Sequence, residues 1–549
     1  MNKYYQSNIH SIEFIENCLK LIAYNNQIEW KDSFLKWEFG KKNKFDFSTS
    51  LLLAISFKTK KKFSDIFLEV KNAFEPIIDS IEISEVNGYL NFFFKSTFYK
   101  NFFNWIIEKD FIFPKRGKIV NVEFASINPT GYLHIGHLRN AVIGNSIANI
   151  YEFFGFEVVR EYYINDRGKQ IDDLIGSVIS YSEKLLGNIK EIDSNVAYKG
   201  KSIEDSAFYI TNHFKINEMK LSNFSFRQKI IDFFINKIKI DLEKLDIYFD
   251  NWFSENEMYL NKEEFEKTLE FLSEKDFVYK SDGAIFLKTS KFGDEKDRVI
   301  VKNSGKFTYF LSDILYHLDK KKRSDIIVDV WGSDHHGYID RLKSALRMFN
   351  HNDVDNFFNV ILIQMVSLTN PEGEIKKLSK RFVNLMSISD IENLIDIDLL
   401  KFYLLETDHN NHVFVNMNSL NNEVKNSKLH YIQYAHARCK KILSKWEIMP
   451  LGQVDEFLLN DRKEKKIFNN LMMFLSNACK ALEQKKPYLI LKYAHSISLE
   501  FHTYYQSIPI LKSDNLDISR QRVALTYAVK KILAICLKML SIEPVDDMH

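Results

Sequence analysis

Cysteine is scarce in this chain, and its positions form no pattern. Four cysteines are scattered among 549 residues without a CxxC pair: Cys18, Cys439, Cys479 and Cys536. The scatter argues against a disulfide framework and against a zinc site, so we expect no structural metal. Free thiols suit a reducing compartment, and we expect a cytoplasmic protein.

Long apolar runs and an N-terminal leader are absent as well. No run approaches the roughly 20 apolar residues that a membrane-spanning helix needs, and no basic-then-apolar signal opens the sequence. We therefore expect no membrane partner. The chain is nevertheless 45% apolar, which suits packed cores, and its 549 residues favour three or four domains.

The charges nearly cancel, but they are unevenly distributed. The whole chain carries +2, whereas the residues from Ser427 onward hold 19 Lys and Arg against 12 Asp and Glu, an excess of +7. A basic C-terminal unit on a slightly acidic body is typical of an RNA-binding module attached to a catalytic domain. Basic helices can also be merely solvated, and charge alone leaves both interpretations open.

The most informative stretch is Asn128–His137, NPTGYLHIGH, between a β-prone run, Ile119–Phe124, and a segment with helical spacing of apolar residues. His134 and His137 therefore sit where a strand turns into a helix, and the unpaired N–H groups there favour a phosphate. Imidazoles three residues apart share one helix face and can both donate to it. Such a pair can also be packed or bind a metal. Two glycines leave room for a nucleotide: Gly131 and Gly136.

A basic segment far away in the sequence, Lys376–Arg381, gives this pattern more weight. It reads KKLSKR and follows a β-like run, Phe357–Val366, and a polar turn. The two stretches, about 240 residues apart, together resemble the HIGH and KMSKS sequences of class I aminoacyl-tRNA synthetases, with Leu378 in place of Met. The resemblance implies an ATP site made of these residues: Asn128, Gly131, His134, Gly136, His137, Lys377, Ser379 and Lys380.

The periodicities divide the chain into three parts. Residues 1–114 mix helical and β-like runs, including a hairpin at Asn87-Gly88, and predict an α+β domain. Strands alternating with helices over 115–396 predict an α/β fold with a parallel sheet, and a helical, charged insertion at about 184–296. Residues 397–549 predict an all-α bundle without strands. Its expected helices are Leu429–Trp446, Ile467–Gln484, Leu489–Gln506 and Arg520–Leu540.

Further motifs make the resemblance specific to the arginyl-tRNA synthetases. They are spread over most of the chain: Val122–Asn128, Tyr163–Gln170, Thr308–Asp313, Asp329–Gly337 and Tyr431–Arg438. The last resembles the family's DALR anticodon-binding domain, and residues 1–114 resemble its added tRNA-binding domain. The resemblance implies a Rossmann-like class I synthetase catalytic domain between the two.

The family's pattern also implies roles for individual residues. Arginine would be held by Glu123, Asn128, Tyr309, Asp313 and Asp334. The tRNA would be held by Tyr431, Tyr434 and Arg438, and catalytic roles would fall to His134, His137, Lys377 and Lys380. A buried guanidinium independently requires carboxylates, because it stays charged and offers a planar fork of donors. Either acid, Glu123 or Asp313, could instead form an internal ion pair.

The implied reaction joins arginine to tRNA(Arg) in two steps. ATP first activates arginine to arginyl-adenylate, with Mg²⁺ bound mainly through phosphate oxygens, and the arginyl group then passes to the terminal adenosine. The resemblance implies that activation needs tRNA, and we expect a monomer. One departure from the family's pattern stands out. Arg381 runs directly into Phe382, about three residues short of the usual spacer.

Other functions stay open at this point. Another HIGH-type enzyme, such as a different class I synthetase or a small nucleotidylyltransferase, would share the histidine turn. An RNA-binding protein with a decayed active site would explain the shortened spacer. A metal hydrolase could use His134, His137, His335 and His336, although the sequence has no HExxH-like pairing of base and ligands.

Overall fold

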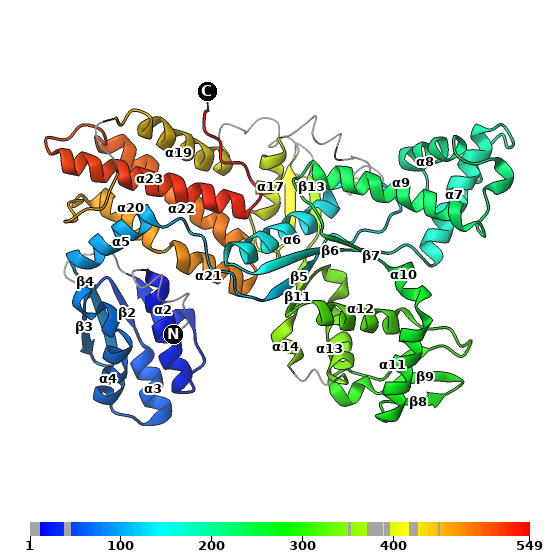
Figure 1. Cartoon of the computed structure of the whole chain (residues 1–549), viewed down its shortest axis with the longest axis horizontal. Coiled ribbons are helices and arrows are strands. Elements are labelled where there is room, and N and C mark those ends of the chain that lie inside the picture. The colour runs from blue at the N-terminus through cyan, green and yellow to red at the C-terminus, as the bar shows by residue number, and fades with distance from the viewer. Residues whose placement is uncertain are drawn as a thin grey trace. The chain divides into compact units, whose positions relative to one another are not determined.

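The computed structural model describes residues 11–37, 45–349, 353–369, 388, 396–416, 427–447 and 451–548. The chain divides into two compact units (Figure 1). One unit comprises Met1–Pro114, Phe153–Gly155 and Glu423–His549, and the other comprises Lys115–Glu152 and Phe156–Asn422. The finer division at 1–114, 115–396 and 397–549 stays a prediction.

A parallel five-stranded sheet forms the core of the second unit. Its strands, in spatial order, are β12 (Phe358–Ile363), β11 (Ile326–Gly332), β5 (Ile119–Glu123), β6 (Glu157–Ile164) and β7 (Asn251–Ser254). The predicted parallel α/β sheet is confirmed. The chain leaves β5 toward β6 on one side, and β11 lies on the other. The carboxyl end of β5 is therefore the point where the strand order reverses, which is where ligands bind in such sheets.

The helix that follows β5 packs closely on the sheet. It is α6 (Ile135–Phe153), and a Cβ atom on its Gly144 would lie 2.3 Å from Phe124. A side chain at this position would therefore push the helix away from the strand. Arg139 of the same helix is 1% exposed and donates to the carbonyl oxygens of Gln364 and Asp408 at 2.8 and 3.0 Å. Its guanidinium ties α6 to the segments beyond β12.

Apolar packing covers the sheet around β11. Buried side chains of α12 (Tyr309–Arg323) and α13 (Ile339–Arg347) share one core with Ile327 of β11. The short helix α14 (Val354–Phe357) joins the same core and leads directly into β12. The periodic apolar face of α12 thus fixes the helix on the sheet and leaves its polar face for the site described below.

The stretch 184–296 is less helical than predicted. It begins within α7 (Lys169–Leu185) and continues through α8 (Lys201–Thr211) and α9 (Phe224–Glu243), but β7 then returns to the core sheet. Beyond β7, α10 (Glu255–Leu260) and α11 (Lys262–Glu274) lead to an antiparallel sheet of β8 (Val278–Ser281), β9 (Ala284–Leu287) and β10 (Arg298–Val301). These strands of four residues are too short to show a two-residue alternation among charged neighbours.

A separate pair of strands corrects a second prediction. β13 (Val366–Thr369) pairs in parallel with β14 (Val413–Asn416), and α17 (Ile397–Leu405) lies between them in the sequence. The sequence pattern predicts no strand after residue 396, and β14 shows that prediction to be wrong. Its four residues again give too little alternation to stand out.

The N-terminal part of the first unit has the predicted α+β character. Its antiparallel sheet has the order β1 (Leu35–Trp37), β2 (Phe47–Thr49), β4 (Tyr89–Phe94) and β3 (Ile81–Val86). The hairpin predicted at Asn87-Gly88 is confirmed, with φ values of 53° and 80° at its two turn residues. Its helices are α2 (Ile12–Asn25), α3 (Leu51–Thr59), α4 (Phe63–Ala73) and α5 (Ser96–Glu108).

The C-terminal part is the predicted all-α bundle. Its helices are α19 (Lys428–Leu443), α20 (Arg462–Met472), α21 (Phe474–Gln484), α22 (Tyr488–Ser507) and α23 (Leu516–Met539). The helix predicted at 467–484 is in fact two, divided at Met473, and the first begins with a capping box between Asp461 and Glu464. No helix in the described part of the chain combines the length and apolarity needed to cross a membrane.

Candidate active site

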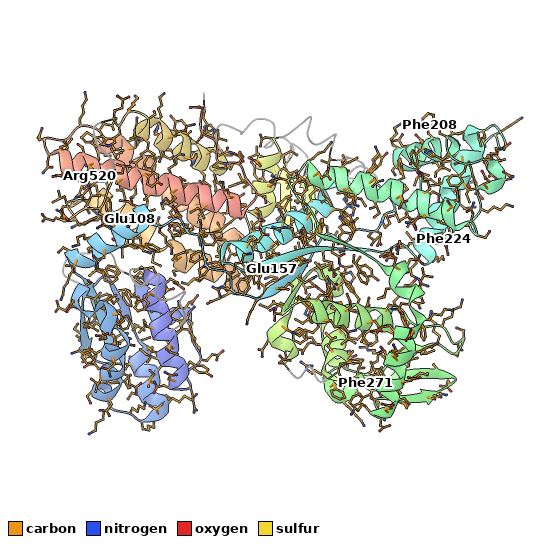
Figure 2. All side chains as sticks on the ribbon, viewed as in Figure 1. Glu108, Glu157, Phe208, Phe224, Phe271 and Arg520 are labelled. Atoms are coloured by element: carbon orange, nitrogen blue, oxygen red, sulfur yellow. The ribbon has the colours of Figure 1, made fainter. Side chains whose placement is uncertain are left out.

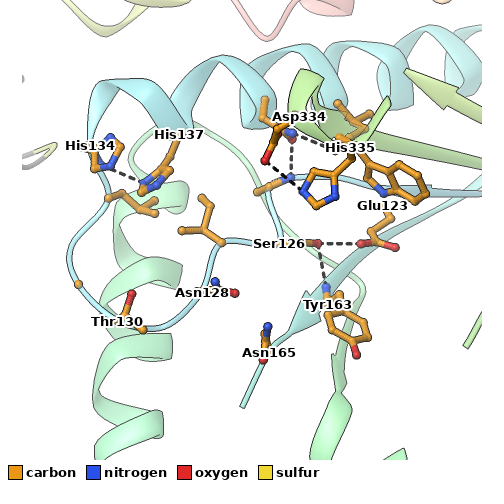
Figure 3. A pocket seen from close by; sticks show the side chains of 18 of the residues that line it. Glu123, Ser126, Asn128, Thr130, His134, His137, Tyr163, Asn165, Asp334 and His335 are labelled. Atoms are coloured by element: carbon orange, nitrogen blue, oxygen red, sulfur yellow. Dashed lines mark hydrogen bonds and ion pairs between the residues drawn. The ribbon is translucent and has the colours of Figure 1, made fainter. Parts of the chain in front are cut away.

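A cavity of about 1150 Å³ opens at the carboxyl ends of β5, β6 and β11. It is lined by Glu123 from β5, by His134 and His137 from the start of α6, and by Asp313 from α12. Figure 3 shows the two histidines on one side of the pocket and Glu123 on the other. The fold therefore brings into one cavity the groups that the sequence predicts for phosphate and for arginine.

Core side chains impose the shape of the loop between β5 and α6. Asn140 accepts from the backbone N–H of Ala125 at 2.7 Å and donates to a carbonyl oxygen of β11 at 2.9 Å. The hydroxyl of Tyr162 bonds both the N–H and the carbonyl of Ile127, at 2.9 and 2.7 Å. Ala125 and Ser126 have φ values of 62° and 44°. Residues other than glycine rarely adopt this left-handed backbone conformation, and the hydrogen bonds from Asn140 and Tyr162 hold the loop in it.

His134 and His137 stack on each other where α6 begins (Figure 3). Their ring centroids are 3.6 Å apart with planes at 26°, and the N–H of His137 donates to the carbonyl of His134 at 2.8 Å. Burial lowers the pKa of both imidazoles, that of His137 to about 3, with repulsion from His134 adding to the effect. Both rings are therefore neutral at pH 7, and each can donate one N–H. Nδ1 of His134 is buried and has no hydrogen-bond partner in the part of the chain that the structure describes.

Glu123 lies on the floor of the cavity with both carboxylate oxygens engaged. Ser126 donates to Oε1 at 3.1 Å, Tyr316 donates to Oε2 at 2.9 Å, and the ammonium of Lys320 pairs with Oε2. Burial raises the pKa of Glu123, and Lys320 opposes that rise. The internal ion pair considered for this acid is thus present, while Oε1 meets a hydroxyl rather than a cation. That Glu123 binds arginine stays a prediction.

Beneath this floor lies a network of buried, paired charges. Lys320 is 0% exposed, and its Nζ lies 2.8 Å from Oδ1 of Asp329, whose Oδ2 lies 2.8 Å from Nε2 of His317. Burial would lower the pKa of Lys320, but the neighbouring carboxylates raise it, so the amine stays charged. Burial would likewise raise the pKa of Glu161, yet Arg323, 2.8 Å away, holds it at about 2. Each of these ions has a counter-ion in place.

Asp313 differs from the acids of the floor because its partner is a hydroxyl. Tyr338 donates a hydrogen bond to Oδ2. Burial raises the pKa of Asp313 to about 6, and the bond from Tyr338 acts against that rise. A buried carboxylate with a raised pKa gains when a cation reaches it. Asp313 therefore has the electrostatic character of a cation-binding group.

The other residues predicted for arginine are more exposed. Tyr309, at the start of α12, is 57% exposed and is not among the residues that line the cavity. Asp334 and Asn128 do line it. The side chain of Asp334 is 84% exposed and lies 3.7 Å from Nε2 of His335, and Asn128 donates to Gln170 at 2.8 Å. These two side chains form part of the rim.

Sequence reasoning missed residues that complete the site. Tyr316 and Lys320 follow Asp313 by three and seven positions on α12, and the helical repeat alone could have placed all three on one face. Tyr338 comes just after the stretch Asp329–Gly337, and no spacing rule points to it. Nor did the sequence indicate that residues around Lys201, in the charged insertion, line the same cavity.

The second motif stretch lies outside the described residues. This applies to Lys377, Ser379 and Lys380, and to Arg381 with the shortened spacer that follows it. In the ranges that the structure does describe, no group of three or more His, Cys, Asp or Glu side chains is arranged to hold a metal ion. A hydrolytic metal centre built on the four histidines of the sequence analysis therefore has no support in those ranges.

A second candidate site lies on the first helix of the bundle. The guanidinium of Arg438 lies 4.3 Å from the ring centroids of both Tyr434 and Tyr505. Tyr434 stacks on His502 at 5.6 Å, and Tyr431 is 44% exposed, with its carbonyl 3.0 Å from Nε2 of His502. The three residues predicted to bind tRNA thus belong to one cluster of aromatic and cationic groups.

Comparison with known families agrees with this architecture. The model of "tRNA synthetases class I (R), catalytic domain" matches residues 108–443, and that of the DALR anticodon binding domain matches residues 432–548. The first match covers more than half of the chain. With its parallel sheet and histidine turn, the chain belongs to the class I aminoacyl-tRNA synthetases.

Individual relatives narrow the class. The arginine–tRNA ligase of Mesomycoplasma hyopneumoniae is 37% identical over 521 residues, which cover 92% of this chain and 91% of that protein. The arginine–tRNA ligase of Listeria monocytogenes is 30% identical over 563 residues and all of both chains. The structure of Thermus thermophilus arginyl-tRNA synthetase shares the fold, with a TM-score of 0.76 at 17% identity over 98% of this chain and 100% of that one. The chain is a member of the arginine–tRNA ligase family, and the predicted class I synthetase fold is confirmed.

Proposed function

We propose that the cavity activates arginine with ATP and that the arginyl group then passes to the 3′-terminal adenosine of tRNA(Arg). The arginine carboxylate attacks the α-phosphate, a new P–O bond forms, and pyrophosphate leaves. A hydroxyl of the terminal ribose then attacks the carbonyl carbon, and AMP leaves. Neither step needs a protein nucleophile. The observation that carries this proposal is the presence of the histidine turn and the Asp313 carboxylate in one cavity.

In this mechanism His134 and His137 stabilise the charge that grows on the phosphate oxygens. A neutral imidazole keeps one N–H, which can donate to a phosphate oxygen, and the first turn of α6 adds backbone N–H groups. Gly131 supports a nucleotide against the backbone, since even an added Cβ would come no nearer to a neighbour than 3.8 Å. Gly136 is part of the same turn.

The remaining ATP contacts come from the second motif stretch. Lys377 and Lys380 bind the triphosphate, and Ser379 assists them, as the family pattern implies. Mg²⁺ enters as part of the nucleotide substrate, because it prefers phosphate oxygens and water to a protein cage. Asn128, at the rim, contacts both substrates.

The guanidinium of arginine binds Asp313. That carboxylate accepts a hydrogen bond from Tyr338 and has no fixed cation among the described residues. An incoming guanidinium therefore meets a carboxylate whose charge is not already paired. Glu123 offers Oε1 to the same group, Tyr309 covers its plane, and Asp334 contacts the rest of the amino acid. A neutral isostere would leave Asp313 buried without a counter-ion, which is the physical basis for rejecting it.

The bundle supplies the tRNA contacts. Tyr431, Tyr434 and Arg438 present rings and a guanidinium on which unstacked anticodon bases can lie, and the basic excess of this region attracts the phosphate backbone. We further propose that the enzyme acts as a monomer in the cytoplasm.

Exchange of pyrophosphate into ATP tests the proposal directly. We expect exchange that depends on arginine and on added tRNA, followed by arginylation of tRNA. Exchange with a different amino acid would identify another synthetase specificity. Tight tRNA binding without exchange would point to a decayed active site. If the protein catalysed no exchange and bound no tRNA, the proposal as a whole would be contradicted.

A further inference from the structure

The helical insertion reaches the histidine turn next to Gly131. The hydroxyl of Tyr132 donates to Oδ2 of Asp205, on α8, at 2.7 Å. Tyr132 stands two residues before His134. The bond to Asp205 is therefore close to the proposed phosphate-binding group.

Asp205 is itself held in place from the other direction. Its Oδ1 lies 2.8 Å from Nζ of Lys201, one turn earlier on α8. Partial burial would raise the pKa of Asp205, but the hydrogen bonds from Lys201 and Tyr132 lower it. The carboxylate therefore stays charged at neutral pH. Hydrogen bonds to an ionised acceptor are stronger than those between neutral groups, so the Tyr132 bond is a firm one.

The other anchors of the loop come from different elements. Asn140 on α6 and Tyr162 on β6 hold its first residues, and Gln170 on α7 accepts from Asn128. These anchors fix the part of the loop that leaves β5. The part that enters α6 is tied to Asp205 through Tyr132. The position of the insertion therefore bears on the position of His134.

The insertion also forms a wall of the reaction cavity. Tyr198, Lys201 and Ser202 line the cavity together with Gly131 and the histidines. Away from the cavity the same small body exposes apolar groups, with Phe208 on α8 and Phe224 on α9 exposed by 65% and 63% (Figure 2). The Tyr132–Asp205 bond is thus one of the contacts that hold the insertion against the active site.

We propose that the Tyr132–Asp205 bond positions the histidine turn, which makes the helical insertion a working part of the active site. Tyr132 and Asp205 are positioning residues in this inference, which rests on the proposed function for its rate measurement. Displacement of a transition-state donor by a fraction of an ångström lowers the rate of the chemical step and leaves substrate affinity nearly unchanged.

Tyr132→Phe is the decisive variant because it removes the hydroxyl and keeps the ring. We expect kcat for arginine-dependent pyrophosphate exchange to fall about 5- to 20-fold, with KM for ATP and for arginine within about twofold. The matched control is Tyr209→Phe. Tyr209 lies on α8, the helix that carries Asp205, and its ring packs against His213 and Phe233. The Tyr209→Phe variant should retain the wild-type kcat.

A double-mutant cycle assigns the effect to the partner. Asp205→Ala should lower kcat by a similar factor, and the double variant Tyr132→Phe/Asp205→Ala should be no slower than the slower single variant. If kcat of the double variant fell by the product of the two single-variant factors, the two residues would act independently and the inference would be overturned. An unchanged kcat in Tyr132→Phe would overturn it as well.

Hydrogen–deuterium exchange separates this inference from the proposed function. The full-length protein without substrates should exchange its amides at 130–134 faster in Tyr132→Phe than in the wild type or in Tyr209→Phe. If the wild type shows no arginine-dependent activity, the proposed function fails. Hydrogen–deuterium exchange alone then tests whether the Tyr132–Asp205 bond positions the histidine turn. Equal protection in all three proteins would then overturn it.

Discussion

The floor of the pocket and the histidine turn at its rim accommodate buried polar groups in opposite ways. On the floor, Glu161 and Lys320 stay ionised because counter-ions lie within 2.8 Å. At the rim, His134 and His137 have no counter-ion among the described residues, and burial lowers their pKa values until both rings are neutral at pH 7. Asp313 lies between these cases, half-buried and carrying a raised pKa of about 6.

The contrast shows which groups are fixed and which can respond to a substrate. A paired charge on the floor gains little from a ligand and costs much to disturb. A neutral donor at the rim can meet growing negative charge, and the Asp313 carboxylate can meet a cation. In the proposed function the paired charges of Lys320, Asp329 and Glu161 therefore act as scaffold, whereas recognition and chemistry fall to His134, His137, Asp313 and the Oε1 atom of Glu123.

Removing the central cation of the floor should have the largest effect. Lys320→Met keeps the length of the side chain but leaves Glu123 and Asp329 buried without their cation, and we expect it to lower the free energy of unfolding by about 3–5 kcal/mol. Urea denaturation measures this. The control is Lys322→Met. The side chain of Lys322 is 66% exposed and its amine pairs with Glu264, so the expected cost is about 0–1 kcal/mol. Equal costs for the two variants would contradict the distinction between floor and surface.

The histidines should affect rate rather than stability. His134→Ala or His137→Ala removes one donor to the transition state and should slow arginine activation by about 10²–10³, with little change in KM for ATP or arginine. Single-turnover adenylate formation gives the rate. His213→Ala, at an exposed position two residues after α8 ends, serves as the control. A double histidine variant with the wild-type rate would remove the turn from the mechanism.

The aromatic cluster of the bundle should affect tRNA binding. Tyr434→Ala deletes a ring against which a base can stack, so the affinity for tRNA should fall by about 1–3 kcal/mol, or roughly 5- to 150-fold. Filter binding at fixed salt concentration measures it. Tyr527→Ala, at a ring that packs on Lys531 of α23, is the matched control. A similar loss in both variants would mean that Tyr434 supports the bundle and does not touch RNA.

Arginine binding should weaken in acid. Asp313 is ionised above its pKa of about 6 and protonated below it, so KM for arginine should rise as the pH falls through 6, by about tenfold between pH 8 and pH 5. His137 should not add to this change, because its pKa of about 3 keeps the ring neutral over the range. In Asp313→Asn the arginine KM should lose this dependence. A slope that persists in the variant would assign the titration to another group.

Much of this architecture could be predicted because its signals are long or periodic. The five-stranded sheet follows from alternating strands and helices, and the Asn87-Gly88 hairpin follows from its turn residues. β7 and β14 escaped prediction because four residues carry no usable period, and the break at Met473 has no proline or glycine to announce it.

The candidate site could likewise be predicted only in part. The resemblance to the family assigns the histidine turn and Asp313 to one site, and the sheet topology explains the position of the turn, which follows β5 at the carboxyl edge. It does not reveal the pairing of Glu123 with Lys320 or the bond from Tyr338 to Asp313. These contacts join residues 197 and 25 positions apart, and they depend on how α12 and the segment after β11 pack.

Discrimination between arginine and citrulline by Asp313→Asn tests the central claim most directly. Citrulline has the shape of arginine without its charge, and asparagine has the shape of aspartate without its charge. The wild type should prefer arginine in pyrophosphate exchange by a factor that the variant largely loses, mainly through a rise in KM for arginine. If the variant discriminates against citrulline as strongly as the wild type does, Asp313 is not the partner of the guanidinium and the account of the pocket is wrong.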